Sequence, residues 1–275
     1  MIERPPMGWN SWNGYLGSPN EAELKATMRY MAAHLLPFGY EYCVTDAGWY
    51  NGLPGSADVS PIPLYACDRH GRPLPHPARY PSVGGSGSFL PISRYAHALG
   101  LKFGLHMMRG MSRRLLGHGF TVCGTDTPLE ELIDLDSPCA WAAESFGVKT
   151  GHPAAQLWYD SLFANFAAWE IDFVKYDDIA SPLHAEEILM IRRAIDGCGR
   201  EITLSLSPGD TTRLSDAAFY SQNADMWRVS KDFWDDWDGN LRESFDLLAE
   251  WNAHIDAPGW PDADMIPIGW LCENP

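Results

Sequence analysis

The sequence predicts a parallel α/β barrel of the TIM (β/α)8 type, on three observations. Short apolar strands alternate along the chain with amphipathic helices, a pattern that favours parallel pairing through βαβ crossovers. Seven such units can be traced, close to the eight of a complete barrel. The alternative, an open doubly wound sheet, usually has a glycine-rich phosphate loop after its first strand, and neither G-x-G-x-x-G nor G-x-x-x-x-G-K-[ST] occurs here. We therefore expect one barrel domain over residues 1–275.

The first unit combines a strand over 7–12 with a helix over 21–36. Ser18 is the predicted cap of that helix, followed by Pro19 at the first helical position and Glu21 three residues after the cap. Gly39 ends the helix, since glycine readily adopts the left-handed conformation that closes helices. The later elements follow in order: strand 40–45, helix 92–99 closed by Gly100, strand 102–108, helix 154–170, strand 171–176, helix 184–198, strand 202–206, strand 224–228, helix 241–251 and strand 264–268.

Two long segments, 51–87 and 109–153, show little periodicity, and loops of such length are usually functional or mobile. The formal net charge of −16, from 20 basic and 36 acidic residues, argues against nucleic acid and against an anionic membrane surface as partners. The sequence contains no stretch of about 18 apolar residues, so we expect no membrane span. The first residues, MIERPPMGWNSW, lack a secretory signal, which favours a cytoplasmic location and free thiols for the six cysteines. The sequence carries no indication of oligomeric state.

Candidate functional residues follow from the barrel, because catalytic groups of such folds lie where strands end and the following loops begin. Carboxylates, cations and tryptophans are concentrated at the predicted strand ends. In strand order they are Trp9, Asn10 and Trp12; Asp46 and Trp49; His106 and Arg109; Lys175, Asp177 and Asp178; Ser205, Ser207 and Asp210; Arg228 and Asp232; and Trp260, Asp262 and Asp264.

A barrel mouth rich in carboxylates suits glycoside hydrolysis, which needs two carboxyl groups on either side of the reacting bond. Asp177 and Asp232 come from different strand ends, so they can face each other across the barrel axis. A cation such as Lys175, two residues before Asp177, would keep that carboxylate ionised, as a nucleophile requires. The acid partner needs the opposite treatment, a raised pKa.

Each of these residues also has a simpler interpretation. Asp177 and Asp178 could be a helix cap and a turn residue, the acidic stretch 232–238 a solvated loop, and the tryptophans and His106 parts of the core. No H-E-x-x-H or His-pair spacing indicates a metal. Ser205 lies in S-L-S-P-G rather than G-x-S-x-G, so a serine hydrolase is not indicated. It is the joint placement at successive strand ends that favours a site.

Four segments resemble one known family, glycoside hydrolase family 27, the melibiase-like α-galactosidases. Residues 5–12 read PPMGWNSW and are similar to the opening signature of the family. Residues 174–177, VKYD, resemble its nucleophile strand, and residues 227–232, WRVSKD, its acid/base segment. Residues 260–265, WPDADM, resemble the seventh-strand motif W-x-D-P-D-M. The four segments occur in the family's order and run through nearly the whole chain.

The resemblance implies a retaining exo-glycosidase that cleaves terminal α-D-galactosyl residues from a glycoside or oligosaccharide substrate. Asp177 would be the nucleophile and Asp232 the general acid/base. Residues that match sugar-contacting positions of the family are Trp12, Asp46, Lys175 and Arg228. To this substrate-binding set we add three residues from the same strand ends, Trp49, His106 and Asp264. Neither a metal nor an organic cofactor is implied.

The sequence departs from the family pattern at the sugar-binding positions. Two adjacent aspartates usually follow the second strand, whereas here the pair is Asp46-Ala47. Residues 205–209, SLSPG, replace a Cys-Glu-Trp element, and residues 104–110, GLHMMRG, replace a Gly-Ile-Tyr type of sequence. These changes keep the catalytic pair but weaken the inference to galactose. The alternatives are the same chemistry on another sugar, such as a β-L-arabinopyranoside, or a non-catalytic carbohydrate-binding barrel.

Family members continue with an eighth strand and a C-terminal antiparallel β domain. This chain stops at Pro275. We therefore expect a barrel that lacks the eighth strand and the β domain, as a fragment or a truncated gene product would. The alternative is that a partner chain or the C-terminal segment itself closes the gap between the first and last strands.

Overall fold

Seven parallel strands form one curled sheet in the computed structural model, which describes residues 2–17, 19–52, 65–234, 236–254, 259–267, 269 and 271. Their order in the sheet is β1 (Gly8–Asn10), β2 (Tyr42–Thr45), β3 (Lys102–Met108), β7 (Phe173–Asp177), β8 (Thr203–Leu206), β9 (Met226–Arg228) and β10 (Trp260–Asp262). Every neighbouring pair is parallel. Among the described residues no ladder joins β1 to β10, so these two strands are the edges of the sheet. The predicted barrel without an eighth strand is thus confirmed for the described part of the chain.

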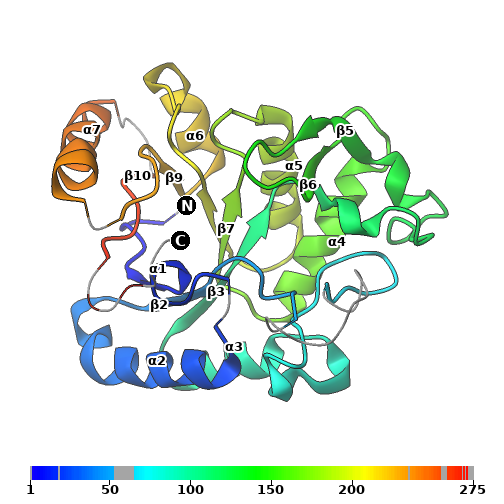
Figure 1. Ribbon diagram of the computed structural model, residues 1–275, viewed down its shortest axis with the longest axis horizontal. Helices are drawn as coiled ribbons and strands as arrows, with labels where there is room; N and C mark the ends of the chain where they lie inside the picture. Colours follow the sequence, from blue (N-terminus) through cyan, green and yellow to red (C-terminus); the bar gives the residue numbers. More distant parts are fainter. Residues whose placement is uncertain are drawn as a thin grey trace.

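Helices surround this sheet on its outer side (Figure 1). They are α2 (Glu21–His34), α3 (Leu90–Ala98), α4 (Ala155–Ala168), α5 (Ala185–Gly197), α6 (Ala217–Asn223) and α7 (Arg242–Asn252), and the short α1 (Trp12–Tyr15) directly follows β1. Single turns of 3₁₀ helix occur at η1 (Leu36–Phe38), η3 (Arg113–Leu115), η4 (Leu129–Glu131) and η5 (Leu214–Asp216). The longer η2 (Pro81–Ser86) joins two 3₁₀ turns across a kink at Gly84, and a π-helical turn at η6 (Trp237–Leu241) leads into α7. Of the helices described, none has the length and apolar character that a membrane span requires.

The burial of the barrel strands explains why their positions could be predicted from the sequence. All four residues of β2 are buried, as expected for a parallel strand covered on both faces. β3 has its predicted bounds, and β1, β2, β7, β8 and β9 lie within two residues of theirs. Gly8 allows β1 to approach β2, because a Cβ at this position would lie 2.0 Å from the Tyr42 carbonyl oxygen.

The excursion over 109–153 folds as a second, antiparallel sheet, which was not predicted. Its strands are β4 (Met111–Ser112), β5 (Ile133–Pro138) and β6 (Ser145–Val148), in the order β4-β6-β5. This sheet lies beside α4 and α5, at the upper right of Figure 1. Because it begins directly after β3, it stands at the carboxyl end of the barrel strands, where the candidate site is expected.

Two predicted details are wrong. The seventh strand is β10 rather than 264–268. The earlier segment was overlooked because it contains Pro261, which lacks an N–H and is tolerated only at a sheet edge, where β10 lies. The cap of α2 is Asn20, which accepts hydrogen bonds from the backbone of Ala22 and Glu23, while the Glu23 side chain returns to the Asn20 N–H. The predicted cap Ser18 and the predicted strand end Ile268 lie outside the described residues.

Helix α6 was also absent from the prediction. The five cysteines of the described chain, Cys43, Cys67, Cys123, Cys139 and Cys198, are free thiols as predicted.

Candidate active site

The carboxyl ends of β1, β2 and β7 meet at Asp46, which is 2% exposed. Its Oδ2 accepts hydrogen bonds from Asn10 Nδ2 at 2.7 Å and from Lys175 Nζ at 3.0 Å. Its backbone N–H donates to Ser11 Oγ at 2.9 Å, and its Oδ1 accepts from the Ala47 N–H at 2.8 Å. Asp46 is therefore held in one orientation by neighbours from two strands and its own loop.

Asp177, the last residue of β7, is the second carboxylate of this network. Its Oδ2 lies 3.2 Å from His106 Nε2, and its Oδ1 accepts the Asp178 N–H at 3.0 Å. The same His106 nitrogen lies 4.0 Å from Asp46 Oδ1, so the imidazole stands between the two carboxylates. Four of the predicted site residues, Asp46, His106, Lys175 and Asp177, thus form one connected group.

The electrostatics of the group keep both carboxylates ionised. Burial by itself would raise the pKa of Asp177, but the hydrogen bond from His106 and the charge of Lys175 outweigh it and hold that pKa well below its usual range. The pKa of Asp46 is lowered in the same way, with burial opposed by the charge of Lys175 and then of His106. Burial opposes the charge of Lys175 too, yet the carboxylates of Asp46 and Asp177 raise its pKa.

Arg228, the last residue of β9, organises the other half of the site. Its Nη1 lies 3.0 Å from Asp264 Oδ1, and its Nη2 lies 3.2 Å from Asp232 Oδ1. Asp264 in turn accepts the Phe233 N–H at 2.7 Å, which fixes the loop that carries Asp232. The Arg228 and Asp264 side chains are 2% and 4% exposed, whereas that of Asp232 is 60% exposed. Asp232 is therefore the carboxyl group of this half that solvent and a substrate can reach.

The end of β10 adds a carboxyl group with the opposite electrostatic behaviour. Burial raises the pKa of Asp262 to about 6, against the charge of Arg228 and with the help of the Asp264 carboxylate. Burial likewise raises the pKa of Asp264, although Arg228 and Lys175 oppose it. Because Lys175 acts on these carboxyl groups as well as on Asp46 and Asp177, the two halves share one electrostatic field.

Several polar atoms of this region have no hydrogen-bond partner among the described residues. They include His106 Nδ1, Arg228 Nε and Ser230 Oγ, all buried. Buried polar atoms are nearly always paired, so these three atoms stand out beside the carboxylates of the site. Within the described chain no three His, Cys, Asp or Glu side chains are grouped as metal ligands.

The two predicted tryptophans differ in their positions. Trp49 is 0% exposed, packs edge-on against Tyr50 and Trp169, and donates its indole N–H to the His106 carbonyl at 2.7 Å. Its burial argues against the predicted substrate contact and makes it a support for β3. Trp12 is half-buried at the start of α1, and its backbone N–H donates to Asn10 Oδ1 at 2.8 Å.

Some residues of the site were missing from the predicted set. Asn10 was noted only as a strand end, although its amide binds Asp46. Asp262 was noted in the same way. The signal that could have selected both is their position at a strand terminus, next to residues already chosen.

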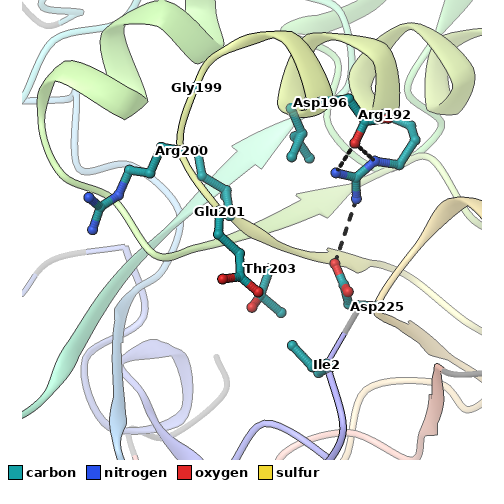
Figure 2. Close-up of a pocket in the computed structure, with 10 residues that line it drawn as sticks. Ile2, Arg192, Asp196, Gly199, Arg200, Glu201, Thr203 and Asp225 are labelled. Carbon is teal, nitrogen blue, oxygen red and sulfur yellow. Dashed lines mark hydrogen bonds and ion pairs between the residues drawn. The ribbon is translucent and has the colours of Figure 1, made fainter.

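A cavity of about 410 Å³ lies elsewhere, at the amino ends of β8 and β9 (Figure 2). Arg192 extends from α5 into this region and pairs with Asp196 at 2.7 Å and with Asp225 at 3.7 Å. The remaining lining includes Arg200, Glu201 and Thr203. Because barrel catalytic groups lie at the carboxyl ends of the strands, this cavity is not the candidate active site.

A parallel α/β barrel with paired buried carboxylates and cations at the carboxyl ends of its strands is the architecture of the barrel glycoside hydrolases. Comparison with known proteins agrees with that class. The family model Melibiase_2, described as alpha galactosidase A, matches residues 142–273. The chain is thus similar to this melibiase-like family, glycoside hydrolase family 27, in both sequence and structure.

Among solved structures, a family 27 β-L-arabinopyranosidase from Geobacillus stearothermophilus is 43% identical, with a TM-score of 0.91 over 98% of this chain and 62% of that chain. A Bacillus halodurans protein with a provisional α-N-acetylgalactosaminidase name is 38% identical, with a TM-score of 0.85 over 98% of this chain and 64% of that one. A rice α-galactosidase is 26% identical over 96% of this chain and 51% of the plant chain. The chain therefore spans about half the length of the first curated relatives it matches.

Proposed function

We propose that the chain is the catalytic barrel of a retaining exo-glycosidase, with Asp177 as nucleophile and Asp232 as general acid/base. The observation that carries this proposal is the contrast between the two carboxyl groups. Asp177 is buried and held ionised by His106 and Lys175, as a nucleophile requires. Asp232 is exposed beside Arg228, where it can exchange protons with a leaving group and with water.

In the first step Asp177 attacks the anomeric carbon, the glycosidic bond breaks, and Asp232 donates its proton to the departing oxygen. The product of this step is a glycosyl ester of Asp177. In the second step the Asp232 carboxylate takes a proton from water, whose oxygen attacks the anomeric carbon and releases Asp177. Asp46, Lys175 and Arg228 are the polar groups that we assign to the hydroxyls of the terminal sugar.

We favour a β-L-arabinopyranoside as the sugar, ahead of the α-D-galactoside that the sequence alone favoured. The two pyranose rings carry the same hydroxyl arrangement, but arabinopyranose lacks the hydroxymethyl group. Ala47 stands where the family has a second aspartate, and it offers only a methyl group and an N–H that Asp46 already accepts. A site without that partner gains little from the extra hydroxyl. The similarity to the Geobacillus β-L-arabinopyranosidase, of which a variant was crystallised with arabinose, supports the same choice.

The α-D-galactoside stays the second candidate, because the curated relatives at 25–28% identity include several named α-galactosidases. A panel of nitrophenyl glycosides separates the two. We expect the wild-type chain, or the longer natural protein if one exists, to release nitrophenol faster from the β-L-arabinopyranoside than from the α-D-galactopyranoside. A preference for galactoside would reverse the order of the candidates, and hydrolysis of neither would refute the glycosidase proposal in favour of a binding barrel.

Two further measurements test the chemistry. NMR of the first-formed sugar should show retained anomeric configuration, and inversion would contradict the double displacement. Asp177→Ala should lose at least about 10⁴-fold in kcat, and added azide should restore turnover as a glycosyl azide. Asp196→Asn, on an exposed side chain beside the cavity of Figure 2, is the matched control and should keep wild-type activity.

A further inference from the structure

A buried arginine lies directly behind the proposed nucleophile. Arg109 follows β3 and is 1% exposed. Its Nε donates to the Asp178 carbonyl at 2.8 Å and to Asp178 Oδ2 at 3.0 Å. Its Nη1 donates to Glu187 Oε1 at 2.9 Å and to Ser137 Oγ at 3.1 Å, and its Nη2 donates to the Ser137 carbonyl at 3.2 Å. The guanidinium is therefore fixed in position by contacts on three sides.

These contacts bracket Asp177 along the chain. The backbone N–H of Arg109 donates to the Asp177 carbonyl at 3.0 Å, while its side chain holds the next residue, Asp178. Asp178 has a φ of +58°, in the left-handed region that few residues other than glycine, asparagine and aspartate adopt. In this conformation its N–H donates to Asp177 Oδ1 at 3.0 Å. The orientation of the nucleophilic carboxylate thus depends on a backbone conformation that Arg109 maintains.

The same arginine connects this point to the antiparallel sheet. Ser137 belongs to β5, and Glu187 on α5 also accepts the Val148 N–H of β6 at 3.3 Å and the Tyr159 hydroxyl of α4. Gly147 makes room for the arrangement, because a Cβ there would lie 2.1 Å from Arg109 Nη1. The sheet over 109–153 is therefore attached to the residue that follows the proposed nucleophile, and not only to the barrel surface.

We propose that Arg109 is a positioning residue for Asp177: through Asp178 it sets the angle of the nucleophilic carboxylate and couples that angle to the antiparallel sheet. The proposal rests on the proposed function, since it assigns a role in the same reaction. Within the described part of the chain, the polar partners of Arg109 are Asp177, Asp178, Ser137 and Glu187 rather than the groups that we assign to the sugar, so its effect should fall on the chemical step and not on binding. Misplacement of a reacting group by about 1 Å can cost about 10²-fold in rate.

The chain offers a matched control for this arginine. Arg200 holds the opposite end of β7, where it donates to the Ile171 carbonyl at 2.7 Å and to the Glu170 carbonyl at 3.1 Å, and it also pairs with Asp172. We compare Arg109→Lys with Arg200→Lys in kcat, KM and inhibition by the free sugar, together with the melting temperature of each variant. Lysine keeps the charge but loses the planar fork that serves several acceptors at once.

The expected result is a loss of about 10²-fold in kcat for Arg109→Lys, with KM and sugar inhibition within about twofold of wild type. Arg200→Lys should lower the melting temperature without changing kcat. Asp178→Asn is the second variant, because asparagine tolerates the left-handed conformation and only the ion pair is weakened. It should lose about tenfold in kcat, and it decides the matter if Arg109→Lys fails to fold.

Equal kcat values for the folded Arg109→Lys and Arg200→Lys proteins would overturn the inference, as would Asp178→Asn with wild-type kcat. Either result would leave Arg109 as an anchor of the antiparallel sheet alone. In both cases an active wild type keeps the proposed function standing. A wild type that hydrolyses no glycoside of the panel instead refutes the proposed function, and this inference falls with it.

Discussion

The two ends of strand β7 carry the same residue types in different surroundings. At the amino end Asp172 lies 2.7 Å from His97 Nε2, and at the carboxyl end Asp177 lies 3.2 Å from His106 Nε2. The His97 side chain is 29% exposed, whereas that of His106 is 1% exposed. The amino end is thus a solvated cluster of charge, and the carboxyl end is a buried one.

The carboxylates at the two ends also accept hydrogen bonds from different partners. Asp172 Oδ2 accepts the Phe103 N–H at 2.8 Å, and Asp225 Oδ2 accepts the Leu204 N–H at 2.9 Å, so each satisfies the backbone of a neighbouring strand. Asp46 and Asp177 instead face Lys175 and His106. The comparison teaches that charge density alone does not mark a site. Buried charges that converge on one another, with unpaired polar atoms beside them, do so.

The largest expected effect comes from the two lysines that stand at opposite ends of the sheet. Lys175→Met leaves the Asp46 carboxylate buried without its cation, which should cost about 3–5 kcal/mol of stability and on the order of 10³-fold in kcat/KM. Lys102→Met removes a 43% exposed partner of Glu41 at the amino end and should cost below about 1 kcal/mol. Denaturant unfolding and steady-state kinetics on both variants check this. Similar losses in the two would contradict the distinction between the ends.

The next effect concerns the two histidines. His106→Leu removes a hydrogen bond that lowers the pKa of Asp177, so this pKa should rise and the acidic limb of kcat/KM should move to higher pH. We expect a loss on the order of 10²-fold at neutral pH. His97→Leu is the control and should leave the pH–rate profile unchanged. An unshifted limb in His106→Leu would show that this hydrogen bond does not govern the ionisation of Asp177.

A smaller effect is expected at Asp262, where burial raises the pKa instead of a cation lowering it. The pKa of Asp262 is about 6 in the folded protein and about 3.9 in an unfolded chain. The folded state therefore binds more protons between these values, so this group lowers stability as the pH rises from about 4 to about 6. The melting temperature of Asp262→Asn, relative to that of wild type, should therefore increase as the pH rises through this window. Above the window the difference between the two melting temperatures should stay constant. A constant difference across the whole range would argue against a raised pKa.

The smallest effect is expected at the cavity of Figure 2. Arg192→Ala removes ion pairs with Asp196 and Asp225 from a side chain that is 21% exposed. We expect a stability loss of about 1 kcal/mol and unchanged turnover, because the Asp196 side chain is 66% exposed and the pair with the buried Asp225 is long, at 3.7 Å. Loss of activity in a stably folded Arg192→Ala protein would show that the amino end of the barrel contributes to function, contrary to the contrast drawn between the two ends.

The barrel strands were predictable because short segments rich in apolar residues alternate with helical patterns, and strands such as β3 and β8 are buried over most or all of their length. The antiparallel sheet was not, since β4 has two residues and β5 buries only Ile133, so neither shows an apolar run. The edge strand β10 was displaced in the prediction because Pro261 indicates a break unless the strand is known to lie at an edge.

For the site, strand ends and the family resemblance together located Asp46, His106, Lys175, Asp177 and Arg228, which the structure brings to one end of the sheet. The roles assigned to them stay predictions. Glu187 could not have been found in this way, because it lies on a helix and acts through a buried arginine. Trp49 was misjudged, since the sequence does not distinguish an aromatic ring in the core from one that lines a cleft.

The left-handed backbone of Asp178 has a consequence for how this position can vary. Glycine, asparagine and aspartate adopt such a conformation at low cost, whereas a β-branched residue would strain the peptide that joins it to Asp177. Position 178 is therefore a poor place for engineering by random substitution, although it contributes no reacting atom. In a library that varies the loop after β7, most members would lose activity because the backbone conformation at position 178 changes. Such losses would be mistaken for the removal of a catalytic group.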